Sequence, residues 1–149
     1  MDLIVTHKNA DFDALSSLVA ASKLYPGARL LLPGSQEKAV RNFLSLIKDK
    51  IRIEDEKTCR MDDVRRLVIV DNRHRSRIGM AAKLLGKKGL KVHIYDHHPR
   101  TRHDIKGDKD IFKEVGATIS IILDILDKKG KLRLMPLEAT LMLLGIYEE

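Results

Sequence analysis

The sequence predicts an α/β fold with an open, mainly parallel, five-stranded sheet and helices on both of its faces. Short aliphatic runs rich in β-forming residues alternate with segments of helical periodicity, and this β-α-β order is typical of parallel sheets. The chain has 149 residues, of which 44% are hydrophobic and 33% charged. This length and composition are typical of one folded domain, so we expect residues 1–149 to form a single domain with an aliphatic core.

Strands are expected where aliphatic runs are too short to form a helix. Residues 67–70 are the strongest of these runs, because a segment that is apolar throughout is typical of a strand covered on both faces. Residues 51–53 are the weakest. The five expected strands are residues 3–6, 28–32, 51–53, 67–70 and 91–95.

Helices are expected where apolar residues recur at core spacing and a stop signal such as Gly89 or Gly130 follows. They are residues 14–25, 36–48, 77–88, 117–129 and 136 to the end of the chain. Residues 98–113 are polar and are expected to form the longest loop. The last helix is apolar nearly all round, so we expect the chain to be the N-terminal part of a longer protein.

The balance of charge points to an anionic partner. Lys and Arg number 28 against 21 acidic residues, a formal net charge of +7. Such a surplus favours a phosphorylated small molecule, a nucleotide or RNA, although a solvated basic surface accounts for it equally well. Aromatic residues make up only 4% of the chain, so base stacking is not expected to dominate binding.

Cysteine usage and hydropathy limit the class of protein further. Cys59 is the single cysteine, which excludes an internal disulfide and a cysteine-rich zinc site. No apolar stretch reaches the roughly 20 residues that span a bilayer. No signal peptide is recognisable at the start of the chain. We therefore expect a cytoplasmic protein with no membrane partner.

Three of the expected strands run into residues that commonly bind metals. In open α/β sheets, ligands bind beyond the carboxyl ends of the strands, so these residues should share one rim. Each of them alone suits a helix cap or an ordinary loop position, but three such groups at neighbouring strand ends favour a metal site. The set is His7, Asp11, Asp13, Asp71, Asp96, His97 and His98.

The mixture of side chains indicates the kind of metal. Carboxylates together with imidazole suit manganese, iron or zinc, whereas all-oxygen sites suit magnesium and calcium. Asp71 follows a central strand and is the natural bridge between two ions. Two ions about 3.5–4 Å apart can share a hydroxide that attacks phosphorus in line.

The pattern His-x-x-x-Asp-x-Asp, then a strand-end Asp, then Asp-His-His resembles the DHH phosphoesterase superfamily. That group includes family II inorganic pyrophosphatases, single-strand-specific exonucleases, oligoribonucleases and cyclic-dinucleotide phosphodiesterases. Residues 9–14, 70–77 and 144–149 are similar to one branch in particular. In that branch the domain precedes paired CBS domains and a poly(A) polymerase or tRNA nucleotidyltransferase-like region.

The resemblance implies a metal-dependent phosphoesterase or phosphodiesterase with two Mn²⁺ ions, for which Mg²⁺ or Co²⁺ are alternatives. His7 and Asp11 would bind one ion. Asp13 and His97 would bind the other, and Asp71 would bridge both. A non-catalytic or regulatory module that binds metal or RNA inside a larger protein is the alternative function.

The resemblance also implies roles around the metals. Asp96 would orient the histidines, and His98 would steady the phosphoryl oxygens or protonate the leaving group. Glu149 stands about where the metal-binding Asp of the family's fourth motif belongs, and the Thr-Gly of that motif is absent. This departure predicts weak metal binding by the chain alone. Four arginines are candidates for holding substrate phosphates, with a solvated surface as the alternative: Arg73, Arg75, Arg77 and Arg100.

Overall fold

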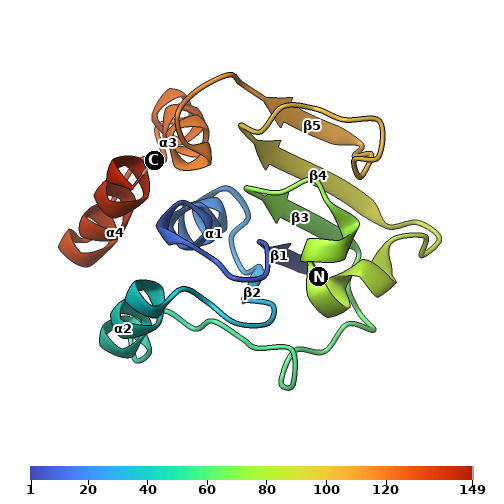
Figure 1. The fold of residues 1–149 in the computed structure, drawn as a ribbon, viewed down its shortest axis with the longest axis horizontal. Coiled ribbons are helices and arrows are strands. Elements are labelled where there is room, and N and C mark those ends of the chain that lie inside the picture. Colours follow the sequence, from blue (N-terminus) through green and yellow to red (C-terminus); the bar gives the residue numbers. More distant parts are fainter. Residues whose placement is uncertain (149) are drawn as a thin grey trace.

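Five parallel strands form a single sheet in the order β2-β1-β3-β4-β5 (Figure 1). The structure is a computed structural model and describes residues 1–148. All four strand pairs are parallel, which confirms the predicted α/β class. The strands are β1 (Asp2–Val5), β2 (Arg29–Leu31), β3 (Arg66–Val70), β4 (Lys91–Asp96) and β5 (Lys109–Phe112).

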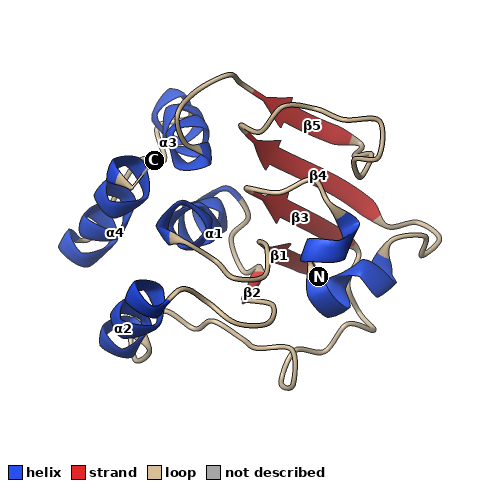
Figure 2. Ribbon diagram, in the orientation of Figure 1, coloured by secondary structure: helices blue, strands red, loops and turns tan. Residues whose placement is uncertain are grey.

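The four α-helices gather on one side of the sheet, and two short 3-10 helices lie on the other (Figure 2). Within residues 1–148 no helix is long and apolar enough to cross a membrane. The helices are α1 (Phe12–Leu24), α2 (Lys38–Ile47), η1 (Arg75–Arg77), η2 (Gly79–Leu84), α3 (Thr118–Lys128) and α4 (Pro136–Tyr147).

Strand β3 shows why the sheet is covered on both faces. Its side chains alternate, so Val68 and Val70 join the core beneath the α-helices. Leu67 and Ile69 point the other way and join a second core beneath the 3-10 helices. All four side chains are fully buried. The uniformly apolar run in the sequence follows from these two cores.

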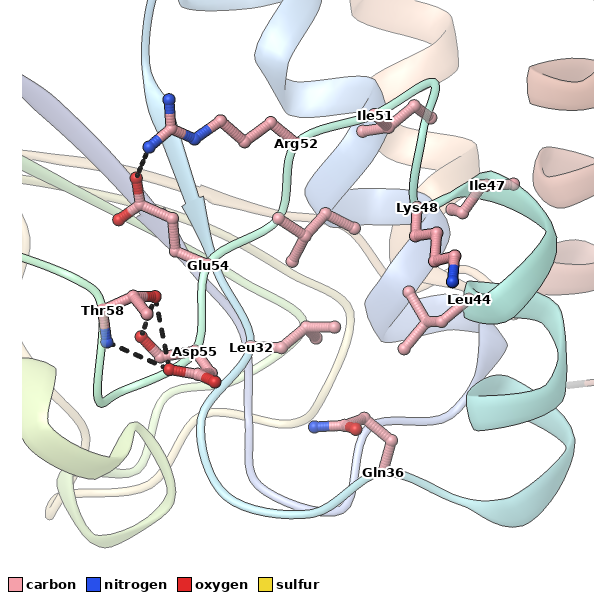
Figure 3. Close-up of a pocket in the computed structure, with 11 residues that line it drawn as sticks. Leu32, Gln36, Leu44, Ile47, Lys48, Ile51, Arg52, Glu54, Asp55 and Thr58 are labelled. Atoms are coloured by element: carbon pink, nitrogen blue, oxygen red, sulfur yellow. Dashed lines mark hydrogen bonds and ion pairs between the residues drawn. The ribbon is translucent and has the colours of Figure 1, made fainter.

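The expectation of a strand at residues 51–53 was wrong. Only Glu54 pairs with the sheet, through a single bridge to Leu31. Ile51 and Ile53 instead pack toward α2 and line a pocket of about 440 Å³ between that helix and residues 51–58 (Figure 3). The β-forming character of this segment therefore serves side-chain packing rather than a ladder of backbone hydrogen bonds.

Strand β5 lies inside the expected loop 98–113, and that expectation was also wrong. β5 is an edge strand that pairs only with β4. None of its four residues is buried, so its sequence lacks the apolar run that marks the central strands. Its extended conformation depends on hydrogen bonding to a neighbour 16 residues earlier, from His93 to Lys109, which no local pattern reveals.

The expected helix 77–88 is replaced by η1 and η2. Ile78, Ala81 and Leu84 are buried at intervals of three residues, which is the repeat of a 3-10 helix. Gly79 has a positive φ of 57°, a conformation that ends regular α-helical geometry. A Cβ at this position would lie 2.8 Å from the Pro33 side chain, so close packing also requires glycine there.

Helix α1 is enclosed between the sheet and α4, and the two helices approach closely at Gly145. The residues of α1 from Phe12 to Ala21 are all buried. A Cβ at Gly145 would lie 3.0 Å from the Phe12 carbonyl oxygen and would overlap the Ser16 hydroxyl. This contact holds α4 against the start of α1, which is also where the candidate metal ligands begin.

We expect Gly145→Val to lower the free energy of unfolding by about 2 kcal/mol, because the added side chain overpacks the contact between α1 and α4. Urea denaturation followed by circular dichroism measures the change. Gly116→Val is the control, because a Cβ there meets no atom within 4 Å, and its effect should stay within about 0.5 kcal/mol. Equal stability of the two variants would contradict the close approach.

Candidate metal centre

Asp71 lies at the carboxyl end of β3, next to the point where the order of the strands reverses. The chain passes from β1 outward to β2, and then returns to the opposite side of β1 for β3. Such a reversal leaves a crevice between the ends of the two strands. Asp71 has a positive φ of 57°, which Asp tolerates better than most residues. Its backbone N–H donates to the Tyr95 carbonyl at 2.9 Å, and the residue is 1% exposed.

His7 faces one oxygen of this carboxylate. The distance from His7 Nε2 to Asp71 Oδ2 is 3.2 Å. His7 Nδ1 lies 2.8 Å from the Lys8 carbonyl oxygen, which can only accept a hydrogen bond. Arg77 Nη2, which can only donate, lies 3.0 Å from the same Nδ1, so the two neighbours of Nδ1 favour opposite tautomers. The tautomer with its proton on Nδ1 keeps the shorter contact, to Lys8, and presents an Nε2 lone pair to Asp71. Ligand atoms of His7, Asp11 and Asp71 all lie within 4.8 Å of one another, a spacing that can enclose a cation.

His97 faces the other oxygen of the same carboxylate. Its Nε2 lies 3.5 Å from Asp71 Oδ1 and 3.6 Å from Asp13 Oδ2. Its Nδ1 lies 2.9 Å from the Val115 carbonyl oxygen and is assigned the proton for the same reason. Nε2 is buried and has no hydrogen-bond partner among residues 1–148. An imidazole lone pair aimed at carboxylate oxygens is repelled unless a cation lies between them, so these donors fit a metal ion.

A second group of ligand atoms, from Asp71, His97 and His98, also lies within 4.8 Å of one another. This group and the group of His7 and Asp11 share Asp71 and no other residue. These two groups could hold two neighbouring cations with Asp71 between them, and Asp13, 3.6 Å from His97 Nε2, is the alternative to His98 as the third ligand of the second.

Asp13 is fully buried and forms the N-terminal cap of α3 from outside that helix. Its two oxygens accept hydrogen bonds from the backbone N–H groups of Thr118 and Ile119, both at 2.9 Å. The residue at the N-cap of α3, Ala117, offers no capping side chain. The Thr118 hydroxyl in turn donates to Asp71 Oδ1 at 2.9 Å. The start of α3 thus fixes both carboxylates that face His97.

Sequence reasoning missed Thr118. One signal for it was present, because residues 116 and 117 are Gly and Ala and cannot cap the helix that follows. The first amides of that helix needed an acceptor from elsewhere in the fold. In contrast, Asp11 is the N-cap of α1 and accepts from the Ala14 N–H at 2.9 Å, one of the capping roles that the sequence left open.

The electrostatics of the protein alone oppose the charged forms of these ligands. Burial raises the pKa of Asp71 well above its usual value, and the neighbouring carboxylates of Asp13 and Asp11 raise it further. Burial also raises the pKa of Asp13. Burial lowers the pKa of His7. A bound divalent cation reverses this preference for the carboxylates and favours the neutral imidazole, so the ligand set is matched to a metal ion.

His98 is set apart from the other histidines by its partner. Its Nδ1 lies 2.6 Å from Asp96 Oδ1, while half of the side chain is exposed. The hydrogen bond to Asp96 raises the pKa of His98 to about 9, so the imidazole is cationic at neutral pH. Asp96 therefore orients His98, whereas His97 is oriented by the carbonyl of Val115.

Arg73 is buried behind the site and holds Asp96 from the other side. Its Nε lies 3.1 Å from Asp96 Oδ2. Its Nη1 donates to Asp110 Oδ2 at 2.8 Å, and Nη2 lies 2.7 Å from Asp110 Oδ1. The side chain is 2% exposed. The sequence suggested Arg73 as a phosphate ligand, but in the structure its guanidinium is already occupied by these two carboxylates.

The other three arginines lie at the surface. Arg77 Nη2 is 3.0 Å from His7 Nδ1, so this side chain borders the metal cluster. Arg100 lies 3.5 Å from Asp110 Oδ1 and covers the Phe112 ring. Arg75 is exposed on η1.

The suggested ligand at position 149 lies outside the residues that the structure describes. The preceding residue, Glu148, accepts a hydrogen bond from the Phe12 N–H at 2.9 Å. The end of α4 is thereby tied to the first turn of α1, immediately after Asp11.

Comparison with known proteins identifies the family of the chain. The model of the DHH family, N-terminal domain, matches residues 3–146. The chain belongs to the DHH family. The resemblance seen in the three sequence motifs is therefore confirmed.

Two curated relatives are A-adding tRNA nucleotidyltransferases. The protein from Geobacter sulfurreducens is 43% identical over the whole chain, and the protein from Aquifex aeolicus is 29% identical over 99% of it. The chain spans only 17% and 16% of their respective lengths. The likeness to the nucleotidyltransferase-associated branch of the family is thus confirmed for a region that forms a small part of each relative.

Two solved structures share the fold. An exopolyphosphatase-related protein from Bacteroides fragilis has a TM-score of 0.78 at 14% identity, over 99% of this chain and 45% of its own. A putative family II inorganic pyrophosphatase from Methanococcus jannaschii has a TM-score of 0.73 at 23% identity, over 97% of this chain and 47% of its own. The chain therefore resembles these two proteins in the fold of its backbone.

We expect Arg73→Met to lower the free energy of unfolding by about 3 kcal/mol, because the buried Asp96 loses one of its two cationic partners and keeps only His98. Urea denaturation of the metal-free protein measures the change. Arg75→Met removes an exposed arginine two residues away and should change stability by less than about 0.5 kcal/mol. A loss of similar size in the two variants would show that the buried ion pair is not the cause.

Proposed function

We propose that this chain is a metal-dependent phosphoesterase domain that hydrolyses a phosphate ester or anhydride of a nucleotide, oligonucleotide or RNA end. The observation that carries the proposal is the position of Asp71 between the imidazoles of His7 and His97. Two ligand groups that share one buried carboxylate suit a pair of divalent ions. Membership of a phosphoesterase family supports the same chemistry.

The ligand set favours Mn²⁺, because it combines several carboxylates with two imidazoles. Mg²⁺ and Co²⁺ are the alternatives. In this proposal His7 and Asp11 hold one ion, Asp13 and His97 hold the other, and Asp71 binds both. Glu149 is a further proposed ligand, at the position of the family's fourth motif. Bound ions would supply a water of lowered pKa and neutralise charge on the phosphoryl oxygens.

The protein's own groups would bind and orient the ester beside this centre. His98 is cationic, partly exposed and fixed by Asp96, so it is suited to hold a phosphoryl oxygen or to give a proton to the leaving oxygen. Arg77 and Arg100 are exposed cations on the loops that border the ligands and are proposed to contact phosphate. Arg73 would act indirectly, by holding Asp96.

RNA is the favoured source of the phosphate. The curated relatives are named for adding A to tRNA, and the chain carries a net charge of +7. We further propose that the domain is the N-terminal part of a longer cytoplasmic polypeptide, because each of these relatives is about six times its length.

We expect Asp71→Asn to abolish Mn²⁺-dependent hydrolysis while the fold remains intact. The amide oxygen can still accept from Thr118, but one neutralised bridge weakens both ions. Removal of one buried negative charge should also raise the thermal midpoint of the metal-free protein. Calorimetric titration with Mn²⁺ and thermal melts in EDTA measure the two effects.

Asp127→Asn is the matched control, because Asp127 is exposed near the far end of α3. It should bind Mn²⁺ as the unmodified chain does. Tight binding of two ions by Asp71→Asn would contradict the bridging role of this carboxylate.

A regulatory module that binds metal or RNA without turnover is the second candidate. The exposed cations beside the ligand groups support it, because they could bind RNA without any reaction. We expect the chain alone to hold the second ion weakly and to hydrolyse pyrophosphate, short oligoribonucleotides and cyclic dinucleotides slowly. A version that restores Asp-Thr-Gly after Glu148 should gain affinity for the second ion and turnover together. A gain of affinity with no turnover on any of the three substrates would favour the regulatory function.

A further inference from the structure

The loops that follow β3 and β4 lie against each other beside the metal centre. One loop continues from Asp71 into η1, and the other continues from His98 to the start of β5. They are joined by a hydrogen bond from the Ile105 N–H to the Arg73 carbonyl oxygen at 2.8 Å. Both loops start at the carboxyl edge of the sheet, one at Asp71 and the other at His98.

Two hollows flank residues 102–104 on this surface. The first, of about 500 Å³, is lined by His74, Arg75, Ser76 and His103. The second, of about 510 Å³, is lined by Arg100, Arg102 and Lys106 among others. The two hollows have no lining residue in common, and we refer to them together as the basic groove.

Part of the positive charge of the basic groove is not used in ion pairs within residues 1–148. Arg75, Arg102 and Lys106 are exposed, and none of them forms an ion pair with a carboxylate within residues 1–148. The carboxylates that line the groove are already engaged. Asp104 accepts from the N–H and hydroxyl of Thr101 at 2.8 and 2.7 Å, and Asp110 is held by Arg73 and Arg100. The groove therefore offers free cations to an anion.

On the basis of the proposed function, we propose that the basic groove binds the phosphodiester backbone of a single-stranded RNA whose end reaches the metal centre. The substrate would then be a chain of nucleotides rather than an isolated phosphate. Three free cations on loops that start at the ligand cluster suit successive phosphates of one strand. Ser76 and Thr101 also line the hollows, and their hydroxyls suit 2′-hydroxyl groups, which donate and accept hydrogen bonds.

The make-up of the groove also indicates how the strand is recognised. No Phe, Tyr or Trp lines either hollow, so the only aromatic surfaces offered to bases there are the imidazole rings of His74 and His103. Binding should therefore depend on phosphate contacts, with little preference for sequence and a strong dependence on salt.

The test is the binding of a fluorescent ten-nucleotide oligo(A) RNA to the 149-residue chain, measured by anisotropy in EDTA at several KCl concentrations. In the groove variant, Arg75, Arg102 and Lys106 are all replaced by Ala. Loss of three contacts to a single strand should reduce the slope of log K against log salt by roughly 2, and should weaken binding about tenfold at 0.1 M salt.

The control variant replaces Arg41, Lys129 and Arg133 by Ala, which removes the same charge from exposed positions on the α-helical side of the sheet. Its affinity should stay within about twofold of the unmodified chain, because these residues contact no phosphate in the proposal. Equal weakening of the two variants would overturn the proposal. Stronger competition by inorganic polyphosphate than by unlabelled oligo(A), at equal phosphate concentration, would also overturn it.

The assay separates this proposal from the proposed function, because it contains no metal and needs no hydrolysis. If RNA binding depends on the groove but the unmodified chain hydrolyses no phosphate ester in Mn²⁺, the result supports the proposal about the groove and contradicts the phosphoesterase function. Hydrolysis of small esters without RNA binding would support the phosphoesterase function and contradict the proposal about the groove.

Discussion

The buried negative charge of Asp71 is the constraint on which the rest of the site depends. Its carboxylate lies in a nearly solvent-free position, close to a second buried carboxylate from Asp13. Within residues 1–148 neither of them is paired with a lysine or arginine. Burial of such charges is costly unless hydrogen bonds and a counter-charge offset it. The surrounding residues supply the hydrogen bonds. His98, 3.8 Å from Asp71 Oδ1, supplies part of the counter-charge, and the geometry leaves the rest to a metal cation.

The hydrogen bonds come from α3, which links the site to the fold. The first two amides of that helix point at Asp13, where the positive end of the helix dipole also lies. The Thr118 hydroxyl reaches Asp71 from the same turn. Because α3 also packs into the core through Ile119 and Ile122, the position of the carboxylates is set by packing rather than by a mobile loop. The same turn of helix therefore stabilises the fold and positions the ligands.

The sequence predicted the buried strands of the sheet better than it predicted the periphery of the fold, and the reason is physical. A strand buried on both faces, such as 67–70, is visible as a local apolar run, and the topology of parallel strands brings its polar end to a known rim. β5 was missed because an edge strand buries no residue fully and takes its conformation from β4. Thr118 was missed because its role depends on a carboxylate 105 residues away from it along the chain, that of Asp13.

Arg73, Arg75 and Arg77 have different environments that the local sequence cannot predict. They alternate in the sequence and look equivalent, yet Arg73 is 2% exposed and the other two are exposed. The difference is set by Asp96 and Asp110, which come from two later strands and enclose the first guanidinium. Its charge is needed there, because Asp96 is fully buried and also carries the hydrogen bond to His98. The first arginine thus offsets a buried carboxylate behind the centre, which leaves only the later ones free to meet an anion in front of it.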